Sequence, residues 1–457
     1  MSTLTRAPDT LFRLYGVAVT FFSLKTYVSC YQAQPELLTS PGAWSLHALS
    51  LTALLLIWRG AHPLLLSLAF GCSVRCLIAT HRASEPLLWF PAAEWPLFIA
   101  LPLLTLISLF MSRPRDPQLT LMSFRLSFLG AMGWAGVHKL NQDFFNLQVS
   151  CARLSERLTA WWGVPEWVYT HVSPALIVSA ELGVGCLLLW RPRWGALMAV
   201  LMLGHFGSIG ATALASVMIA MALAFLSPAE LRAFRSAPQH RPLLSICIVI
   251  LAVALSYYTY QGSWSWLQYG LFHGLISLIL IGLVAVLRSD VTAPRVNTLP
   301  NSRAHRRFAT LILLGWTLNG LTPYLGLKFH YSFAMLSNLR VDDHRWNSYL
   351  LSKRWRWSEY DGLIQVREVV YRARSTGRLL RGGPLKPGLY PPSSLRAYLE
   401  SADQAQEYIL AHVSYRGRSH DFLNQPPQRL REWLGALPDT PLVQKKLTLN
   451  QPQRCIH

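Results

Sequence analysis

LMSFRLSFLGAMGWAGVHKLNQDFF, residues 121–145, joins an apolar helix to a polar and aromatic segment. The first part is apolar enough to lie in lipid, although Arg125 interrupts it. The run ends at Lys139, after which an amide, an acid and two phenylalanines follow. The stretch therefore predicts a membrane helix that stops on a lysine, and that lysine is either an anchor or a chemical group.

The composition extends this membrane interpretation to the rest of the chain. Of 457 residues, 52% are hydrophobic and only 14% are charged, whereas a soluble domain has about 25% charged residues. The net charge of +20 comes largely from basic residues in short segments between apolar runs, where such residues set membrane orientation. We therefore expect a membrane protein and no nucleic-acid partner.

The apolar runs predict an all-α polytopic membrane bundle of about nine to eleven transmembrane helices. Candidate spans lie near 10–29, 43–58, 61–80, 95–112, 119–138, 173–190, 195–211, 212–227, 242–259, 265–287 and 308–325. Gly207 and Gly210 favour two helices over one in 195–227. With the N-terminus in the cytoplasm, basic residues gather in the inner loops. Lys139 and the chain after 325 then lie on the extracytoplasmic side, periplasmic in a bacterium.

The C-terminal part has a different pattern and predicts a small extracytoplasmic α+β domain. LIQVREVVY, residues 363–371, alternates as a strand does. RGGPLKPGLYPPSS, residues 381–394, is typical of a loop. SLRAYLESADQAQEYILAHV, residues 394–413, has helical periodicity with a serine at its start. We place the domains at 1–330 for the membrane part and 331–457 for the C-terminal part.

Three of the seven cysteines fall on the predicted outer side: Cys30, Cys151 and Cys455. An oxidising compartment allows one disulfide among them, but the sequence does not select the pair.

Ionisable residues inside apolar runs are costly and are candidate functional residues. The main ones are Lys25, Arg75, Arg125, Glu181, His205 and His273. Alternatively, Arg125 and Glu181 pair between neighbouring helices and serve packing alone. Arg125 is about four helical turns from Lys139, so the two side chains do not form one catalytic pair.

Lys139 also has two interpretations. A lysine at the end of a membrane helix usually reaches into the headgroup region as an anchor. Aromatic neighbours remove water from an amine and favour its neutral form, which can act as a general base. Asp143 favours the charged form instead.

Several motifs occur in a fixed order over most of residues 10–350. They are Arg125; Gly136, Lys139, Leu140 and Asp143; Glu181, Leu187, Leu188 and Arg191; His205; Ile209 and Gly210; Phe225, Leu226, Ser227 and Pro228; and LTPYLGLKFHYSFAMLSNLR, residues 321–340. In this order they resemble the HTTM family of membrane proteins, which includes vitamin K-dependent gamma-glutamyl carboxylase. Phe144 stands where the family has tryptophan, and Ala334 where the carboxylase has an acid.

The resemblance implies a lyase of carboxylase type with Lys139 as the catalytic base and Arg125, Asp143, Glu181 and His205 as supporting residues. In the carboxylase, the matching lysine deprotonates vitamin K hydroquinone. Oxygenation then yields a base that removes a proton from a substrate glutamate, to which CO₂ adds. The implied cofactors are reduced vitamin K or menaquinol, with O₂ and CO₂ and without a metal.

Two other classes of function remain open. One alternative is a non-enzymatic membrane protein that binds lipid or a protein. The other is a transporter in which Arg125 and Glu181 line the path of the transported molecule. The expected partners are membrane lipid or a quinone, together with an exported peptide or protein substrate.

Overall fold

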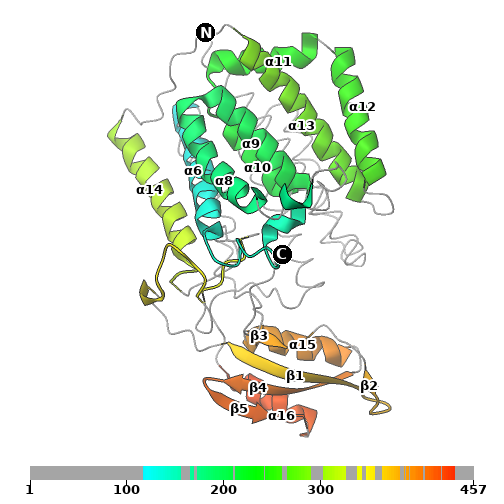
Figure 1. The fold of residues 1–457 in the computed structure, drawn as a ribbon. Helices are drawn as coiled ribbons and strands as arrows, with labels where there is room; N and C mark the ends of the chain where they lie inside the picture. The colour runs from blue at the N-terminus through cyan, green and yellow to red at the C-terminus, as the bar shows by residue number, and fades with distance from the viewer. Residues whose placement is uncertain are drawn as a thin grey trace, which may run out of the picture. The chain divides into compact units, whose positions relative to one another are not determined.

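The computed structural model describes residues 117–155, 165–168, 172–208, 212–240, 242–259, 265–289, 302–325, 337–341, 346–355, 363–380, 385, 387–390, 392–404, 407–423 and 425–437. They fall into two compact units (Figure 1). The helical unit holds the described residues of 117–136 and 154–317, and the C-terminal unit holds those of 137–153 and 318–437. The predicted spans before residue 113 lie outside the described residues.

The helices have the following bounds. They are α6 (Pro117–Lys139), α8 (Ser173–Trp190), α9 (Pro192–Phe206), α10 (Thr212–Leu223), α11 (Pro228–His240), α12 (Pro242–Thr259), α13 (Ser265–Arg288) and α14 (Arg303–Leu321), with a short 3-10 helix, η3 (Cys151–Ser155). The break between α9 and α10 confirms that 195–227 forms two helices. The end of α6 at Lys139 confirms where the apolar helix stops.

Small residues let the helices of the helical unit approach closely. A Cβ atom added at Gly130 of α6 would lie 2.8 Å from Cγ of Trp316 in α14, and one added at Gly136 would lie 2.6 Å from Cδ2 of Leu182 in α8. Small residues at helix interfaces permit this close packing in apolar bundles. Gly130 and Gly136 therefore serve packing, whereas a Cβ atom at Gly133 would meet nothing within 4 Å.

The sequence SPAE, residues 227–230, starts α11 with a capping box. The backbone N–H of Ser227 donates to Oε2 of Glu230 at 2.7 Å, and the N–H of Glu230 donates to Oγ of Ser227 at 3.3 Å. Arg193 at the start of α9 donates from Nε to Oε1 of the same Glu230 at 2.5 Å and from Nη1 to the carbonyl of Ser289 at 3.1 Å. Glu230 therefore ties three helix ends together.

His273 of α13 links further segments of the helical unit. Its Nε2 lies 2.8 Å from Oγ of Ser208, and its Nδ1 lies 2.7 Å from Oγ of Ser256 in α12. Each ring nitrogen thus has a hydroxyl partner, as a polar ring in apolar surroundings requires.

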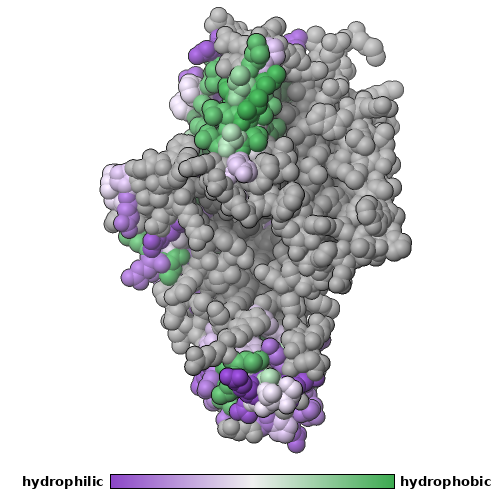
Figure 2. Space-filling view, turned by 90° about the vertical axis from the view of Figure 1, so that its right-hand side faces the viewer, coloured by the Kyte–Doolittle hydropathy of each residue, from purple (hydrophilic) through white to green (hydrophobic). Residues whose placement is uncertain are grey.

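The surface of the helical unit exposes large apolar side chains. In α12, the exposed members are Leu243, Ile246, Ile250, Leu251, Leu255 and Tyr257. Figure 2 shows this face as the hydrophobic patch near the top of the view. Patches of this kind mark contact with lipid or with another protein.

The C-terminal unit contains a five-stranded antiparallel sheet of order β2-β1-β4-β5, in which β3 also pairs with β1. The strands are β1 (Ile364–Ala373), β2 (Leu379–Leu380), β3 (Gly388–Tyr390), β4 (Glu407–Tyr415) and β5 (Arg418–Asp421), and the helices are α15 (Pro392–Gln404) and α16 (Pro427–Gly435), with a short 3-10 turn, η6 (Lys353–Trp355). A two-residue turn joins β4 to β5, and positive φ at Arg416 (48°) and Gly417 (75°) suits such a hairpin.

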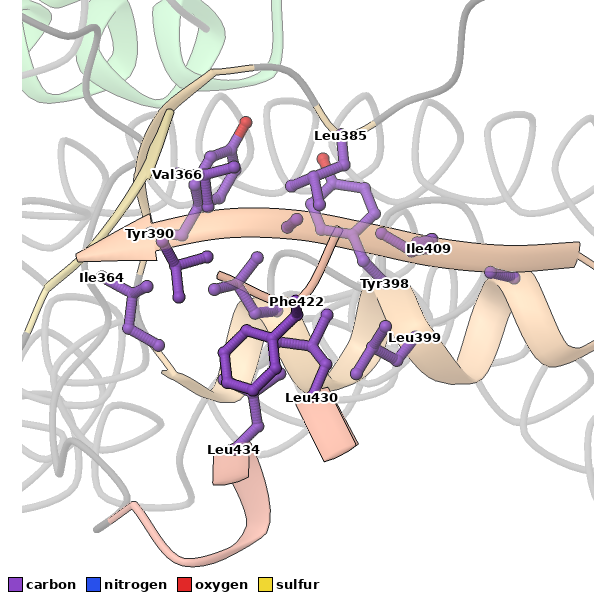
Figure 3. Close-up of a cluster of buried hydrophobic side chains, with 14 of the residues drawn as sticks. Ile364, Val366, Leu385, Tyr390, Tyr398, Leu399, Ile409, Phe422, Leu430 and Leu434 are labelled. Atoms are coloured by element: carbon purple, nitrogen blue, oxygen red, sulfur yellow. The ribbon is translucent and has the colours of Figure 1, made fainter. Parts of the chain in front are cut away.

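One face of this sheet is covered by α15 and α16. Alternate residues of β4, namely Ile409, Ala411 and Val413, belong to a core that also contains side chains of both helices. Figure 3 shows Leu399 of α15 and Leu430 of α16 beside Phe422 in this core. These three residues occupy alternate positions, which face the same side of a strand, and Leu410 between them is also buried, at 4% exposed.

The prediction of an all-α polytopic bundle with about nine to eleven spans is wrong. The described chain is mixed, with helices and an antiparallel sheet, and within it only Ser173–Trp190 is long and apolar enough to cross a membrane. Two shorter apolar helices, Ser245–Tyr257 and Phe272–Arg288, accompany it. Apolar runs were counted as spans, but several form helices such as α10 with 12 residues, too short for a span of about 20.

The C-terminal predictions have mixed outcomes. LIQVREVVY is confirmed as strand β1. The helix predicted over 394–413 is wrong in its second half, because α15 ends at Gln404 and Glu407–Tyr415 forms strand β4. Pairing with β1 on one side and β5 on the other overrides the local helical periodicity. The predicted loop 381–394 contains the short strand β3.

Candidate functional site

Asn141 determines how α6 ends beside Lys139. Its Nδ2 donates to the carbonyl of His138 at 2.7 Å and to that of Ser337 at 2.5 Å, while its Oδ1 accepts from the N–H of Phe144 at 2.9 Å. The last carbonyls of a helix lack partners within the helix, and the Asn141 amide supplies one. The same amide fixes the turn that follows Lys139.

A second segment, residues 337–349, pairs with this turn. The N–H of Gln142 donates to the carbonyl of Asn347 at 2.9 Å, and the N–H of Tyr349 donates to the carbonyl of Leu140 at 3.1 Å. Segments separated by about two hundred positions in the chain therefore form one local structure within the C-terminal unit. We call it the lysine cluster: residues 138–145, 324 and 337–349, as far as these are described.

Asn347 is the centre of the lysine cluster. Its Nδ2 lies 2.9 Å from Oδ2 of Asp143, 2.9 Å from the carbonyl of Asn338 and 3.4 Å from Oδ1 of Asn141. Its Oδ1 accepts from the N–H of Arg340 at 2.8 Å. One fully buried amide thus fixes Asp143 relative to both neighbouring segments.

Lys139 is only 2% exposed, and Asp143 is 1% exposed. The Lys139 Nζ atom lies 6.0 Å from the centre of the Phe144 ring, within the range of a cation–π contact. An anchoring lysine reaches outward so that its amine meets water or headgroups, and the burial of Lys139 is the opposite arrangement. The structure therefore places Lys139 as an interior group of the protein.

Aromatic rings lead from Lys139 toward the surface. Phe144 is buried, Phe145 is 37% exposed and Tyr349 is 59% exposed. The ring centres of Phe144 and Phe145 are 5.9 Å apart, and those of Phe145 and Tyr349 are 6.4 Å apart. Such a series of rings offers stacking surfaces to a flat apolar molecule.

His138 and Tyr324 form a second polar pair in the cluster. Nδ1 of His138 lies 3.1 Å from the hydroxyl of Tyr324, and the two rings stack with centres 5.4 Å apart. Burial raises the pKa of Tyr324 to about 12, and a hydrogen bond with the Ser348 side chain partly opposes this shift. Tyr324 consequently keeps its proton at neutral pH.

Only two of the five predicted site residues belong to the lysine cluster, namely Lys139 and Asp143. Arg125 is buried in α6 of the helical unit, where its Nε donates to the carbonyl of Ala224 at 2.8 Å and its guanidinium lies 5.9 Å from the centre of the Phe225 ring. The bond goes to a carbonyl and not to Glu181. Arg125 therefore contributes to packing between α6 and the end of α10.

Glu181 and His205 also lie in the helical unit. Glu181 is a buried residue of α8, and a Cβ atom added at Gly136 would lie 3.4 Å from the Cβ atom of Glu181. His205 is half-buried in the last turn of α9.

Several buried polar residues of the cluster were missed by the sequence interpretation. They are His138, Asn141, Tyr324, Asn338, Arg340 and Asn347. Tyr324, Asn338 and Arg340 fall within the segment 321–340 that resembles the HTTM family, so this match was the available signal. Nothing in the local sequence around Asn347 distinguishes it from a surface asparagine.

Cys151, close to the lysine cluster in the chain, is disulfide-bonded. Asn338 positions this cysteine, because its Oδ1 accepts from the N–H of Cys151 at 2.7 Å. The other described cysteines, Cys186 and Cys247, are free thiols, and the partner of Cys151 lies outside the described residues. A disulfide here is expected in an oxidising compartment.

None of the comparisons with protein-family models, with curated proteins and with solved structures finds a match to the chain. The resemblance to the HTTM family therefore stays a prediction.

Proposed function

We propose that the chain is a membrane-associated enzyme of carboxylase type in which Lys139 accepts a proton from a reduced quinone. The observation that carries this proposal is the burial of the Lys139 amine beside the Phe144 ring. A lysine that only anchors a helix has no need to be buried, and burying an ammonium group is costly. A general base, in contrast, benefits from exclusion of water.

The surroundings of Lys139 fit a quinone. The rings of Phe144, Phe145 and Tyr349 provide flat apolar surfaces for its ring system, and the exposed end of this series gives it a route of entry. When bound, a reduced quinone supplies an acidic hydroxyl and reducing equivalents. Lys139 would accept the hydroxyl proton at Nζ, and Asn347 would keep Asp143 at a fixed distance from it.

The apolar surface of the helical unit supports a location at the membrane. Exposed leucine and isoleucine side chains of α12 suit lipid better than water. The disulfide at Cys151 supports an extracytoplasmic position for the lysine cluster. An exported peptide with glutamate residues is the substrate class that this position allows.

The test uses the purified full-length chain with menaquinol and bicarbonate in air. We expect consumption of menaquinol and, with a glutamate-containing peptide, a mass gain of one CO₂. Lys139→Arg retains a cation but not a usable base, so it should abolish both signals, as should Lys139→Ala. Lys353→Ala, which removes an exposed lysine, is the matched control and should leave both intact.

Two results would overturn the proposal. One is undiminished consumption by Lys139→Arg, which would show that only the positive charge matters. The other is absence of any menaquinol consumption by the wild-type chain, which would favour a non-enzymatic role in binding lipid or protein.

A further inference from the structure

The outer face of α14 divides into a basic and an apolar part along the helix axis. Arg303, Arg306 and Arg307 are exposed in its first turns. Leu311 and Leu314, which follow, are 62% and 50% exposed. Over the roughly 16 Å that the helix rises from Arg303 to Leu314, the surface changes from cationic to aliphatic.

The inner face of the same helix is already occupied. Ala309, Ile312 and Trp316 are buried, and the Trp316 Nε1 donates to Oγ of Ser127 in α6 at 3.3 Å. The arginines and leucines therefore do not serve packing within the helical unit. They form a surface that a partner outside the described chain can cover.

The three arginines lie where a helix does not favour them. The N-terminal end of a helix carries partial positive charge, so that acids stabilise it and cations destabilise it. The first turn of α14 contains no acid, and no Asp or Glu occurs anywhere in Arg303–Leu321. An anionic partner would offset this concentration of positive charge.

We propose that the outer face of α14 binds anionic phospholipid. The guanidinium groups of Arg303, Arg306 and Arg307 contact headgroup phosphates, and Leu311, Leu313 and Leu314 contact the adjoining acyl chains. Separation of charge and apolar surface along the axis matches the change from headgroup to hydrocarbon with depth in a bilayer.

The face of α12 provides a contrast within the same unit. Its exposed side chains Leu243, Ile246, Ile250, Leu251, Leu255 and Tyr257 include no charge. Contact of α12 with lipid should therefore depend on acyl chains alone, whereas contact of α14 should depend on headgroup charge and on salt.

The experiment measures which lipid the full-length chain retains. The chain, purified in a mild non-ionic detergent, is incubated with equal amounts of phosphatidylglycerol and phosphatidylcholine, and the retained phospholipid is quantified by mass spectrometry after gel filtration. Wild type should be enriched in phosphatidylglycerol, and added salt should reduce the enrichment. Arg306→Gln should lower the enrichment about fivefold, and the triple variant Arg303→Gln/Arg306→Gln/Arg307→Gln by on the order of 100-fold.

The control variant Arg367→Gln/Arg418→Gln/Arg429→Gln removes the same charge from exposed positions of the C-terminal unit and should keep the enrichment. Leu311→Gln/Leu314→Gln should lower retention of both lipids alike. Equal retention of both lipids by wild type, or full enrichment in the α14 triple variant, would overturn the proposal. Displacement of phosphatidylglycerol by inorganic phosphate, beyond the displacement caused by sodium chloride at the same ionic strength, would overturn the assignment to lipid. None of these readouts requires activity at Lys139, so the result is independent of the proposed enzyme function.

Discussion

The two units place apolar side chains in opposite ways. In the C-terminal unit, large apolar residues of β1 and β4 turn inward to one core, and the exposed positions of β1 are mostly charged. In the helical unit, α12 contains no charged residue and exposes leucine and isoleucine side chains. The first arrangement satisfies water, and the second requires a covering medium. The two units therefore present different kinds of surface.

The largest expected effect concerns the partly buried ion pair between Arg193 and Glu230 in the helical unit, whose side chains are 24% and 5% exposed. Glu230→Ala removes the partner of a guanidinium and the capping box of α11, and we expect the free energy of unfolding to fall by about 3–5 kcal/mol. Hydrogen exchange of α11 peptides in the detergent-solubilised chain measures this loss. A fall of less than about 1 kcal/mol would mean that the pair does not hold the helix ends together.

A core substitution in the C-terminal unit should have a slightly smaller effect. Ile409 of β4 is 3% exposed in the core, and Ile409→Ala should lower the free energy of unfolding of this unit by about 2–5 kcal/mol. Exchange should accelerate in β1 and β5, the neighbours of β4. Matching acceleration in α13 would contradict the division into two units.

Tyr371 offers a test with a defined pH dependence. Its hydroxyl accepts from the N–H of Leu385 at 2.5 Å, so Tyr371→Phe leaves a buried N–H without that partner and should cost about 1–3 kcal/mol. Burial raises the pKa of Tyr371 to about 12 from the ordinary 10.0, although the backbone hydrogen bond with Leu385 acts in the opposite direction.

The sign of the pH effect follows from proton binding. The folded state holds the Tyr371 proton more tightly than the unfolded state, so this stabilisation is complete below pH 10 and is lost as pH rises from 10.0 to about 12. Tyr371→Phe should therefore make the unfolding free energy fall less steeply over this interval. Identical slopes for the two proteins would show that another group accounts for the alkaline loss.

The smallest expected effect concerns the surface pair Arg429 and Glu432 of α16. Both side chains are 68% exposed and their charged atoms are 3.8 Å apart. Arg429→Ala should change the free energy of unfolding by only about 0.2–0.5 kcal/mol, measured by exchange of α16 peptides. A loss comparable to that of Glu230→Ala would mean that the exposure of an ion pair does not decide how much it stabilises its unit.

Local sequence patterns predicted some elements correctly. The alternation of LIQVREVVY is visible locally and predicted β1, and the glycines after His205 predicted the break between α9 and α10. The strand β4 was not predictable, because its identity depends on hydrogen bonds to β1 and β5. Within the described residues, the number of membrane spans was overestimated, partly because an apolar run such as 212–227 forms a helix of only 12 residues.

The candidate site shows the same limit at the level of single residues. Lys139 and Asp143 were identified from one short segment, since a lysine at the end of an apolar helix is conspicuous in the sequence. Asn347 was missed, although it bonds directly to Asp143 at 2.9 Å. Its role arises only when distant segments come together, and no periodicity or motif near it records that approach.

The order of residues was enough to predict that α6 ends at Lys139 and that the C-terminal part differs in composition from the helices before it. These properties follow from local chemistry, that is, from the order of apolar, polar and turn-forming residues. The burial of the Lys139 side chain, at 2% exposed, became visible only in the folded chain. Burial depends on which remote residues pack around a site, and here Ser337 and Asn347 bond to Asn141 and Asp143 beside Lys139.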